Sequence, residues 1–127
     1  ADLAEMYCAD QFYPPGTVVE FGGNEETTAT SAAHSTKIAG VVSTNPAYIM
    51  NAGAGGNAVI TVALLGRVPC RVIGPIAKGD RIVSSDIPGV AQALDPALYQ
   101  PGCIVGKALE SYTDTAVGVI EVVVGRI

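Results

Sequence analysis

Two carboxylates near the chain start, Asp2 and Glu5, have a spacing that allows chemistry. On a helix, residues three apart lie on one face, and crowding raises the pKa of one carboxylate. That group can then donate a proton or assist scission of a peptide bond. The same pair also forms a capping box ahead of the apolar stripe Leu3, Met6 and Tyr7. Both interpretations predict a helical turn within residues 1–9, and the capping box is the favoured one.

The other constellations that resemble catalytic or phosphate-binding sites lack essential parts. Ser43 stands in GVVSTNP, which is not the GxSxG elbow of a serine hydrolase, and His34 is the only histidine available as its base. The glycine-rich stretch 51–58, NAGAGGNA, lacks the Lys-Ser/Thr of a phosphate-binding loop, and a strand pattern follows it. We therefore predict no catalytic residue, no cofactor-binding residue and no cofactor.

Cysteine and histidine usage argues against a metal centre or a disulfide framework. One histidine is too few for the usual histidine-based zinc sites, and no CxxC pair replaces it. Cys8, Cys70 and Cys103 are odd in number and far apart, so we expect three reduced, buried thiols and no metal site.

Charge and hydropathy restrict the partners. The formal charge of −5 argues against nucleic acid, and the apolar runs are far shorter than the about 20 residues of a membrane span. Six acids precede the first base, Lys37, and four of the seven bases fall within residues 67–81. These are either two solvated faces of a monomer or complementary patches that meet across copies of the chain.

The remaining pattern predicts an all-β fold, a small barrel or sandwich of short strands, in one domain spanning 1–127. Apolar, β-branched runs between glycine and proline turns predict the strands, whereas residues 22–36 read as a loop or weak edge strand. Gly66 and Pro69 mark a bulge or a sheet edge within one long stretch. The last strand looks apolar on both faces, so we expect both faces to be covered, within the chain or by another subunit.

A weak duplication divides the chain into two halves. The first half contains PGTVVEF, IAGVVS and TVALLGRV, and the second contains KGDRIVSS, CIVGKALE and EVVVGRI. The glycines match in three pairs, which are Gly16 with Gly79, Gly40 with Gly106, and Gly66 with Gly125. Either short strands echo each other by chance, or the domain consists of two pseudo-repeated halves with Gly-Arg turns at 66–67 and 125–126.

Six blocks of the chain occur in a telling order, and they are ADLAEMY, PGTVVEFGG, IAGVVSTNPAYIMN, VALLGRVPCRVIGPIAKGD, IVGKALE and GVIEVVVGRI. Together they resemble the C-terminal domain of tail-fibre-type structural proteins of contractile-tailed phages that infect marine cyanobacteria. The resemblance implies a virion protein, a homotrimeric β module for assembly or host attachment, with residues 1–9 joining an upstream stalk. Its implied partners are further copies of itself, other virion proteins and a host surface glycan. Since the chain does not start with Met, we expect the gene product to begin upstream of Ala1.

Two alternatives come with this resemblance. The opening and the GVVS-NP block are similar to fibre-terminal chaperone domains that cleave themselves, in which acids of the opening motif take part in scission; these would be Asp2 and Glu5 here. The strand pattern around KGD is similar to small trimeric capsid-decoration proteins. The structural module is the favoured function, with no enzyme activity beyond such self-cleavage.

Overall fold

The computed structural model describes residues 1–125 and 127. Its ten strands belong to one connected sheet, so the all-β prediction is confirmed. The elements are β1 (Asp2–Cys8), β2 (Val18–Phe21), β3 (Thr27–Ala29), β4 (Ile38–Val42), β5 (Tyr48–Met50), β6 (Val59–Val72), β7 (Arg81–Ser84), β8 (Ala91–Ala93), the 3-10 helix η1 (Pro96–Leu98), β9 (Gly106–Ala108) and β10 (Gly118–Val124).

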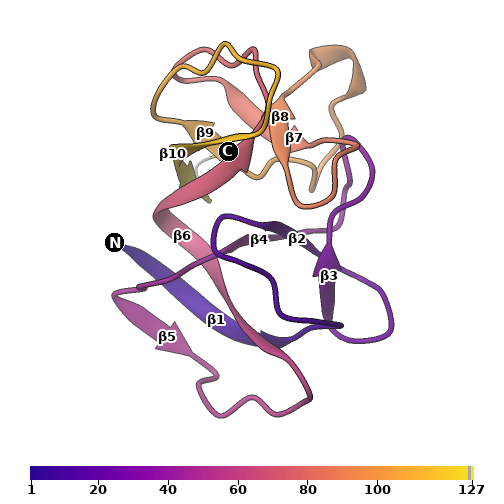
Figure 1. The fold of residues 1–127 in the computed structure, drawn as a ribbon, viewed down its shortest axis with the longest axis vertical. Helices are drawn as coiled ribbons and strands as arrows, with labels where there is room; N and C mark the ends of the chain where they lie inside the picture. The colour runs from indigo at the N-terminus through magenta and orange to yellow at the C-terminus, as the bar shows by residue number, and fades with distance from the viewer. Residues whose placement is uncertain (126) are drawn as a thin grey trace.

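The long strand β6 runs through both halves of the molecule and connects them (Figure 1). Its first half pairs antiparallel with β1, and its second half pairs antiparallel with β10. Both neighbours meet it at one residue, because Asp2 and Val124 are each paired with Gly66.

Each half of β6 takes part in a ring of five strands. In the C-terminal barrel, β6, β10, β9, β7 and β8 form a closed circuit whose last pairing is Val72 with Ala91. In the N-terminal barrel, β1, β6, β4, β2 and β3 follow the same order, and a single parallel bridge between Ala9 and Thr27 closes the ring. Figure 1 shows the N-terminal barrel below and the C-terminal barrel above.

The two barrels repeat each other at the level of single hydrogen bonds. The Gly16 N–H donates to the Val42 carbonyl at 2.8 Å, and the Gly79 N–H donates to the Ala108 carbonyl at 2.8 Å. The closing contacts match as well, since the Asp10 N–H donates to the Thr27 carbonyl in one ring and the Ile73 N–H donates to the Ala91 carbonyl in the other. The predicted pseudo-repeat is therefore present in the fold, and we call residues at matching places counterparts.

The matched glycines are counterparts because each lies where backbones cross closely. A Cβ atom at Gly40 would collide with the Ala63 carbonyl oxygen, and one at Gly106 would collide with the Val123 carbonyl oxygen. Ala63 and Val123 are themselves counterparts on β6 and β10. Only glycine permits this approach of neighbouring strands.

The third glycine pair follows the same rule where the barrels meet. A Cβ at Gly66 would lie 2.5 Å from the Ala1 carbonyl oxygen, and one at Gly125 would lie 2.8 Å from the Leu64 carbonyl oxygen. Gly66 lies in the middle of β6, so the expected Gly-Arg turn at 66–67 is wrong. Of the second expected turn, Gly125 lies in a turn and Arg126 lies outside the described residues.

One hydrophobic core continues from barrel to barrel. Val18 and Val41 of the N-terminal barrel pack in the same cluster as Val68, Ile82 and Val122 of the C-terminal barrel. A smaller cluster around Val19 and Val62 lies within the N-terminal barrel. Burial of this apolar surface is the main favourable contribution to folding.

The helical turn predicted at residues 1–9 is wrong, because Asp2–Cys8 form strand β1. Local capping and the apolar stripe favoured a helix, but pairing with β6 on one edge and β5 on the other satisfies the backbone instead. Leu3, Met6 and Tyr7 are consequently only half-buried, whereas Asp2 and Ala4 point inward.

Two expectations that the sequence left open are narrowed by the structure. The segment 22–36 contains the short strand β3 at the end of the strand order, which pairs with β2 to form a hairpin, so the edge-strand alternative is confirmed. The last strand, β10, is buried on one face only, since Ile120 and Val122 point into the barrel while Val119 is 60% exposed. On its outer face Val119 is therefore uncovered in the single chain, whereas Glu121 and Val123 are half-buried.

Replacing Gly40 or Gly106 by alanine should destabilise the fold by more than about 2 kcal/mol, because a backbone carbonyl must move to admit the new methyl group. Chemical denaturation measures the loss. Gly55→Ala is the matched control, since nothing lies within 4 Å of its Cβ position. A neutral Gly106→Ala would contradict the close crossing of β9 and β10.

Candidate functional site

Asp2 and Glu5 do not form a carboxylate pair, because their side chains lie on opposite faces of β1. Asp2 is buried, with only 6% of its surface exposed, and its Oδ1 accepts a hydrogen bond from the Ser43 Oγ at 3.2 Å. Its other oxygen, Oδ2, has no hydrogen-bond partner among the described residues. Asp2 and Ser43 are thus the buried polar pair at the chain start.

The backbone around Asp2 is held firmly. The Arg67 N–H donates to the Ala1 carbonyl at 3.2 Å, and the Ala47 N–H donates to the Asp2 carbonyl at 2.9 Å. A carboxyl group with a free oxygen therefore lies next to a fixed peptide segment, which is an arrangement that general acid or base chemistry can use.

Glu5 belongs to a different environment on the outer face of β1. It accepts a hydrogen bond from the Tyr7 hydroxyl at 3.0 Å. Partial burial, together with this carboxylate, raises the pKa of Tyr7. Tyr7 also packs edge-on against Phe21, with ring centroids 5.4 Å apart. Glu5 therefore helps to orient an aromatic pair at the surface.

His34 and Ser43 are not brought together, so no serine-hydrolase arrangement forms. The His34 Nε2 accepts a hydrogen bond from the Asp95 N–H at 3.1 Å, which ties the N-terminal barrel to the C-terminal one. No cluster of metal-ligating side chains occurs among residues 1–125 and 127.

The three cysteines are free, as expected, but they are not all buried. Cys70 is fully enclosed, and this burial raises the pKa of its thiol to about 12. Cys103 is also buried, whereas Cys8 is half-exposed. The Cys8 pKa is raised by desolvation and by the neighbouring Glu25 carboxylate, so the thiol stays protonated near neutral pH.

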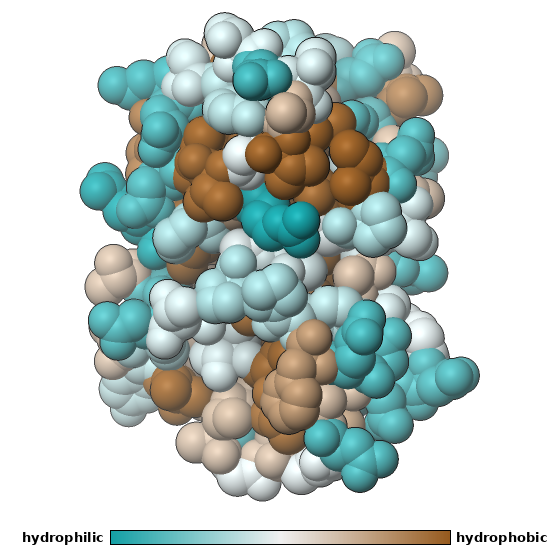
Figure 2. Space-filling view, viewed as in Figure 1, coloured by the Kyte–Doolittle hydropathy of each residue, from teal (hydrophilic) through white to brown (hydrophobic). Residues whose placement is uncertain are grey.

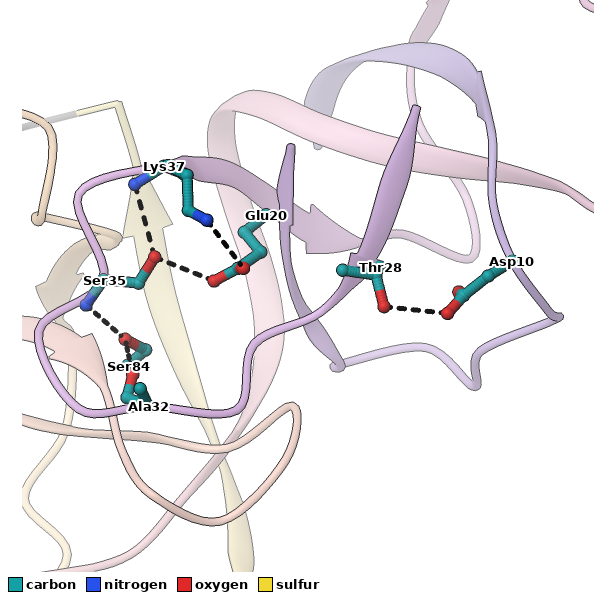
Figure 3. Close-up of polar contacts among 7 residues, drawn as sticks. All are labelled: Asp10, Glu20, Thr28, Ala32, Ser35, Lys37 and Ser84. Carbon is teal, nitrogen blue, oxygen red and sulfur yellow. Dashed lines mark hydrogen bonds and ion pairs between the residues drawn. The ribbon is translucent and has the colours of Figure 1, made fainter. Parts of the chain in front are cut away.

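A polar network joins the two barrels (Figure 3). The Ser84 Oγ donates to the Ala32 carbonyl at 2.8 Å and accepts from the Ser35 N–H at 2.9 Å. Ser35 in turn donates to Glu20 at 2.8 Å, and Glu20 forms an ion pair with Lys37 at 3.8 Å. These contacts fix the segment between β3 and β4 on the C-terminal barrel.

The two barrels differ in charge. Residues 1–66 contain six acids and one base, which gives a formal charge of −5, whereas residues 67–127 contain six acids and six bases and are neutral. The acidic excess thus belongs to the N-terminal barrel, and nearly all bases belong to the other. The two barrels lie one above the other along the long axis of the molecule (Figure 1), so this difference in formal charge distinguishes its two ends.

Exposed aromatic and apolar side chains accompany these charges. On the N-terminal barrel, Phe21 is 43% exposed and lies in the hairpin that also carries Glu25 and Glu26. On the C-terminal barrel, Tyr99 is 47% exposed and has the Arg81 guanidinium 5.8 Å from its ring centroid. Figure 2 shows apolar side chains gathered on the surface of both barrels, with a more polar band between them.

A hollow opens beside the basic residues. It is lined by Lys78, Gly79, Lys107, Ala108, Leu109 and Val123. Its lining is mainly apolar and includes two lysines, for which no carboxylate partner lies within ion-pair distance among the described residues. Such a surface suits a protein partner that is acidic at its edge.

These surface residues were not singled out from the sequence, which indicated only the overall distribution of charge. The signal that could have found them is the duplication itself. Phe21 and Ser84 are counterparts, so an exposed aromatic occupies the place where the other half has a serine at the barrel junction.

No family model matches the sequence, and no curated protein matches it significantly. Solved structures do match. The C-terminal fragment of gene product 12 of bacteriophage phi29 is similar over 97% of this chain and 99% of its own, with a TM-score of 0.69 and 18% identity. The N base of the phi29 head fibre gp8.5 is similar over 97% and 93%, with a TM-score of 0.56 and 13% identity. At these identities the likeness shows a shared fold.

One structural finding concerns membranes. None of the helical segments within residues 1–125 and 127 is long and apolar enough to span a bilayer.

Replacing Ser84 by alanine should lower the free energy of unfolding by about 1–3 kcal/mol, because the Ala32 carbonyl and the Ser35 N–H both lose their buried partner. Thermal or chemical denaturation measures the change. Ser31→Ala, on the exposed part of the same segment, should change stability by less than about 0.5 kcal/mol. Equal effects of the two variants would show that the junction network is not stabilising.

Proposed function

We propose that this chain is a structural module of a phage virion, of the fibre type, that works by self-association. The observation that carries the proposal is the match of nearly the whole chain to two phage proteins, one of them the base of a head fibre. Because the likeness extends from end to end in both comparisons, the complete module is shared and not only a common barrel.

The surface supports an assembly role. The acidic excess of the N-terminal barrel, the exposed aromatics and the exposed Val119 of β10 are features of a subunit that makes contacts with others.

The finer role follows from the sequence resemblance. We propose a homotrimer in a fibre or appendage of a contractile-tailed phage, with a part in assembly or host attachment. A capsid location, like that of a decoration protein, is the alternative that the head-fibre likeness supports.

At micromolar concentration the chain should elute from a size-exclusion column with the mass of a trimer, as measured by light scattering. Its melting temperature should rise with protein concentration, because association stabilises the folded state by mass action. A monomer with a concentration-independent melting temperature would contradict the proposed assembly role.

A second candidate, self-cleavage at the chain start, is favoured by one specific observation. Asp2 is buried and keeps one carboxyl oxygen free beside the fixed Ala1 carbonyl. Glu5 faces away from this place, so of the two acids only Asp2 is positioned to take part.

A fusion that places a carrier protein before Ala1 tests this activity. If the chain cleaves itself, mass spectrometry should detect the released domain, and Asp2→Asn should reduce the rate at least tenfold. Glu5→Gln should cleave at the rate of the unmodified chain. An intact fusion over days at 37 °C would eliminate this second function and leave the first one untouched.

A further inference from the structure

Within the chain, the two barrels contact each other through different surfaces. The residues that make this one-sided contact have counterparts that do not take part in it. The Gly16 carbonyl accepts a hydrogen bond from the Arg71 N–H at 2.9 Å, and Gly16 is buried against the Arg71 side chain. The counterparts of these residues are Gly79 and Cys8. Gly79 is exposed, and no atom lies within 4 Å of its Cβ position. The Cys8 N–H instead donates to the side chain of Glu26 at 2.9 Å.

The neighbouring contact is one-sided as well. The Val18 N–H donates to the Gly89 carbonyl at 2.9 Å, and the Gly89 N–H donates to the Thr30 carbonyl at 2.9 Å. The counterparts of Val18 and Gly89 are Arg81 and Glu25. Both side chains are exposed, and among the described residues no ion pair joins them.

The counterpart of Gly89 follows from the hairpin turns. The Gly22 N–H donates to the Glu26 carbonyl at 3.2 Å, and the Ser85 N–H donates to the Val90 carbonyl at 2.9 Å. Glu26 therefore matches Val90, and Glu25 matches Gly89.

The third part of the junction completes the pattern. Ser84 contacts the segment between β3 and β4 through Ala32 and Ser35. The counterpart of Ser84 is Phe21, and the counterpart of that segment is the connection between β8 and β9. This connection carries the exposed side chains of Leu98 and Tyr99.

A contact that uses different surfaces of two similar units is heterologous. Each barrel therefore keeps one of the two surfaces without a partner, and we call it the unfilled surface. The unfilled surface of the C-terminal barrel carries Arg81, Tyr99 and the hollow beside Lys78. The unfilled surface of the N-terminal barrel carries Glu25, Phe21 and Cys8. The basic side chain of Arg81 on one surface is therefore complementary to the acidic side chain of Glu25 on the other. Each surface also exposes an aromatic side chain.

We propose that copies of this chain associate head to tail by repeating the contact that joins the two barrels. The C-terminal barrel of one copy receives the N-terminal barrel of the next, with Arg81 facing Glu25, Tyr99 facing Phe21, and the hollow facing Cys8. This inference rests on the self-association in the proposed function and specifies its interface. The occupant is a second copy because the N-terminal barrel carries the counterparts of the residues that make the internal contact.

Charge reversal tests the predicted pairing. Arg81→Glu and Glu25→Arg should each weaken self-association at least tenfold in sedimentation equilibrium, because each places like charges in contact. The double variant should regain association to within about threefold of the unmodified chain. Arg67→Glu is the control, because the exposed Arg67 side chain is not part of the proposed interface, and this variant should leave association unchanged. Circular dichroism confirms that each variant is folded.

Cross-linking gives an independent readout that depends less on affinity. Cys8 is the half-exposed cysteine, whereas Cys70 and Cys103 are 0% exposed. Lys78→Cys should therefore form cross-links between copies through Cys8 when a short bismaleimide is added. The variant Lys78→Cys with Cys8→Ser should lose the links between unlike positions.

The outcomes separate the two proposals. Association that survives both single reversals, or a double variant that stays as weak as the single ones, overturns this interface while self-association stands. In the Lys78→Cys variant, links between the introduced thiols of two copies that persist without Cys8 would indicate a two-fold contact and overturn the head-to-tail arrangement. A chain that is monomeric before any substitution overturns the interface and the assembly role together.

Discussion

Everything in this fold depends on the sharing of strand β6 by two barrels. A strand in an ordinary barrel has two edges and gives each to one neighbour, but β6 changes neighbours along its length. At Gly66, β1 begins on one edge and β10 ends on the other, and the absence of a side chain there lets the Ala1 carbonyl approach. Beyond it, Arg67 and Arg71 donate their N–H groups to Ala1 and Gly16, while Pro69 between them has no N–H to satisfy.

This constraint makes the two halves rigidly related. A flexible linker would have allowed the barrels to contact each other in several orientations, but a continuous strand sets one relative orientation. In that orientation the N-terminal barrel covers its Gly16 surface with the other barrel, and the C-terminal barrel leaves its Gly79 surface open. The asymmetry of the surface is thus a consequence of the shared strand.

The sequence carried much of the fold because turns, strands and the glycine pairs are local signals. Gly40 and Gly106 could be matched from the sequence because each interrupts a run that contains β-branched residues. Strand β1 could not be predicted, because its capping box and apolar stripe are local, whereas its pairing with β6 and β5 depends on distant segments. The Asp2–Ser43 contact joins strands far apart in the chain, so spacing suggested the wrong partner, Glu5. Of the two barrel surfaces, the sequence indicated only the uneven distribution of charge. Counterparts such as Phe21 and Ser84 are defined by strand register, which the sequence does not give.

The difference between those two counterparts has a physical reason. Inside the chain, the shared strand holds the barrels at high effective concentration and a common core already joins them, so at this place the hydrogen bonds of Ser84 are sufficient. A contact between separate copies must also overcome the loss of translational and rotational freedom. Apolar and charged groups such as Phe21, Tyr99, Glu25 and Arg81 provide burial and long-range attraction, which serine does not. The repeat therefore keeps one geometry while its chemistry differs according to whether the partner is in the same chain or in the next.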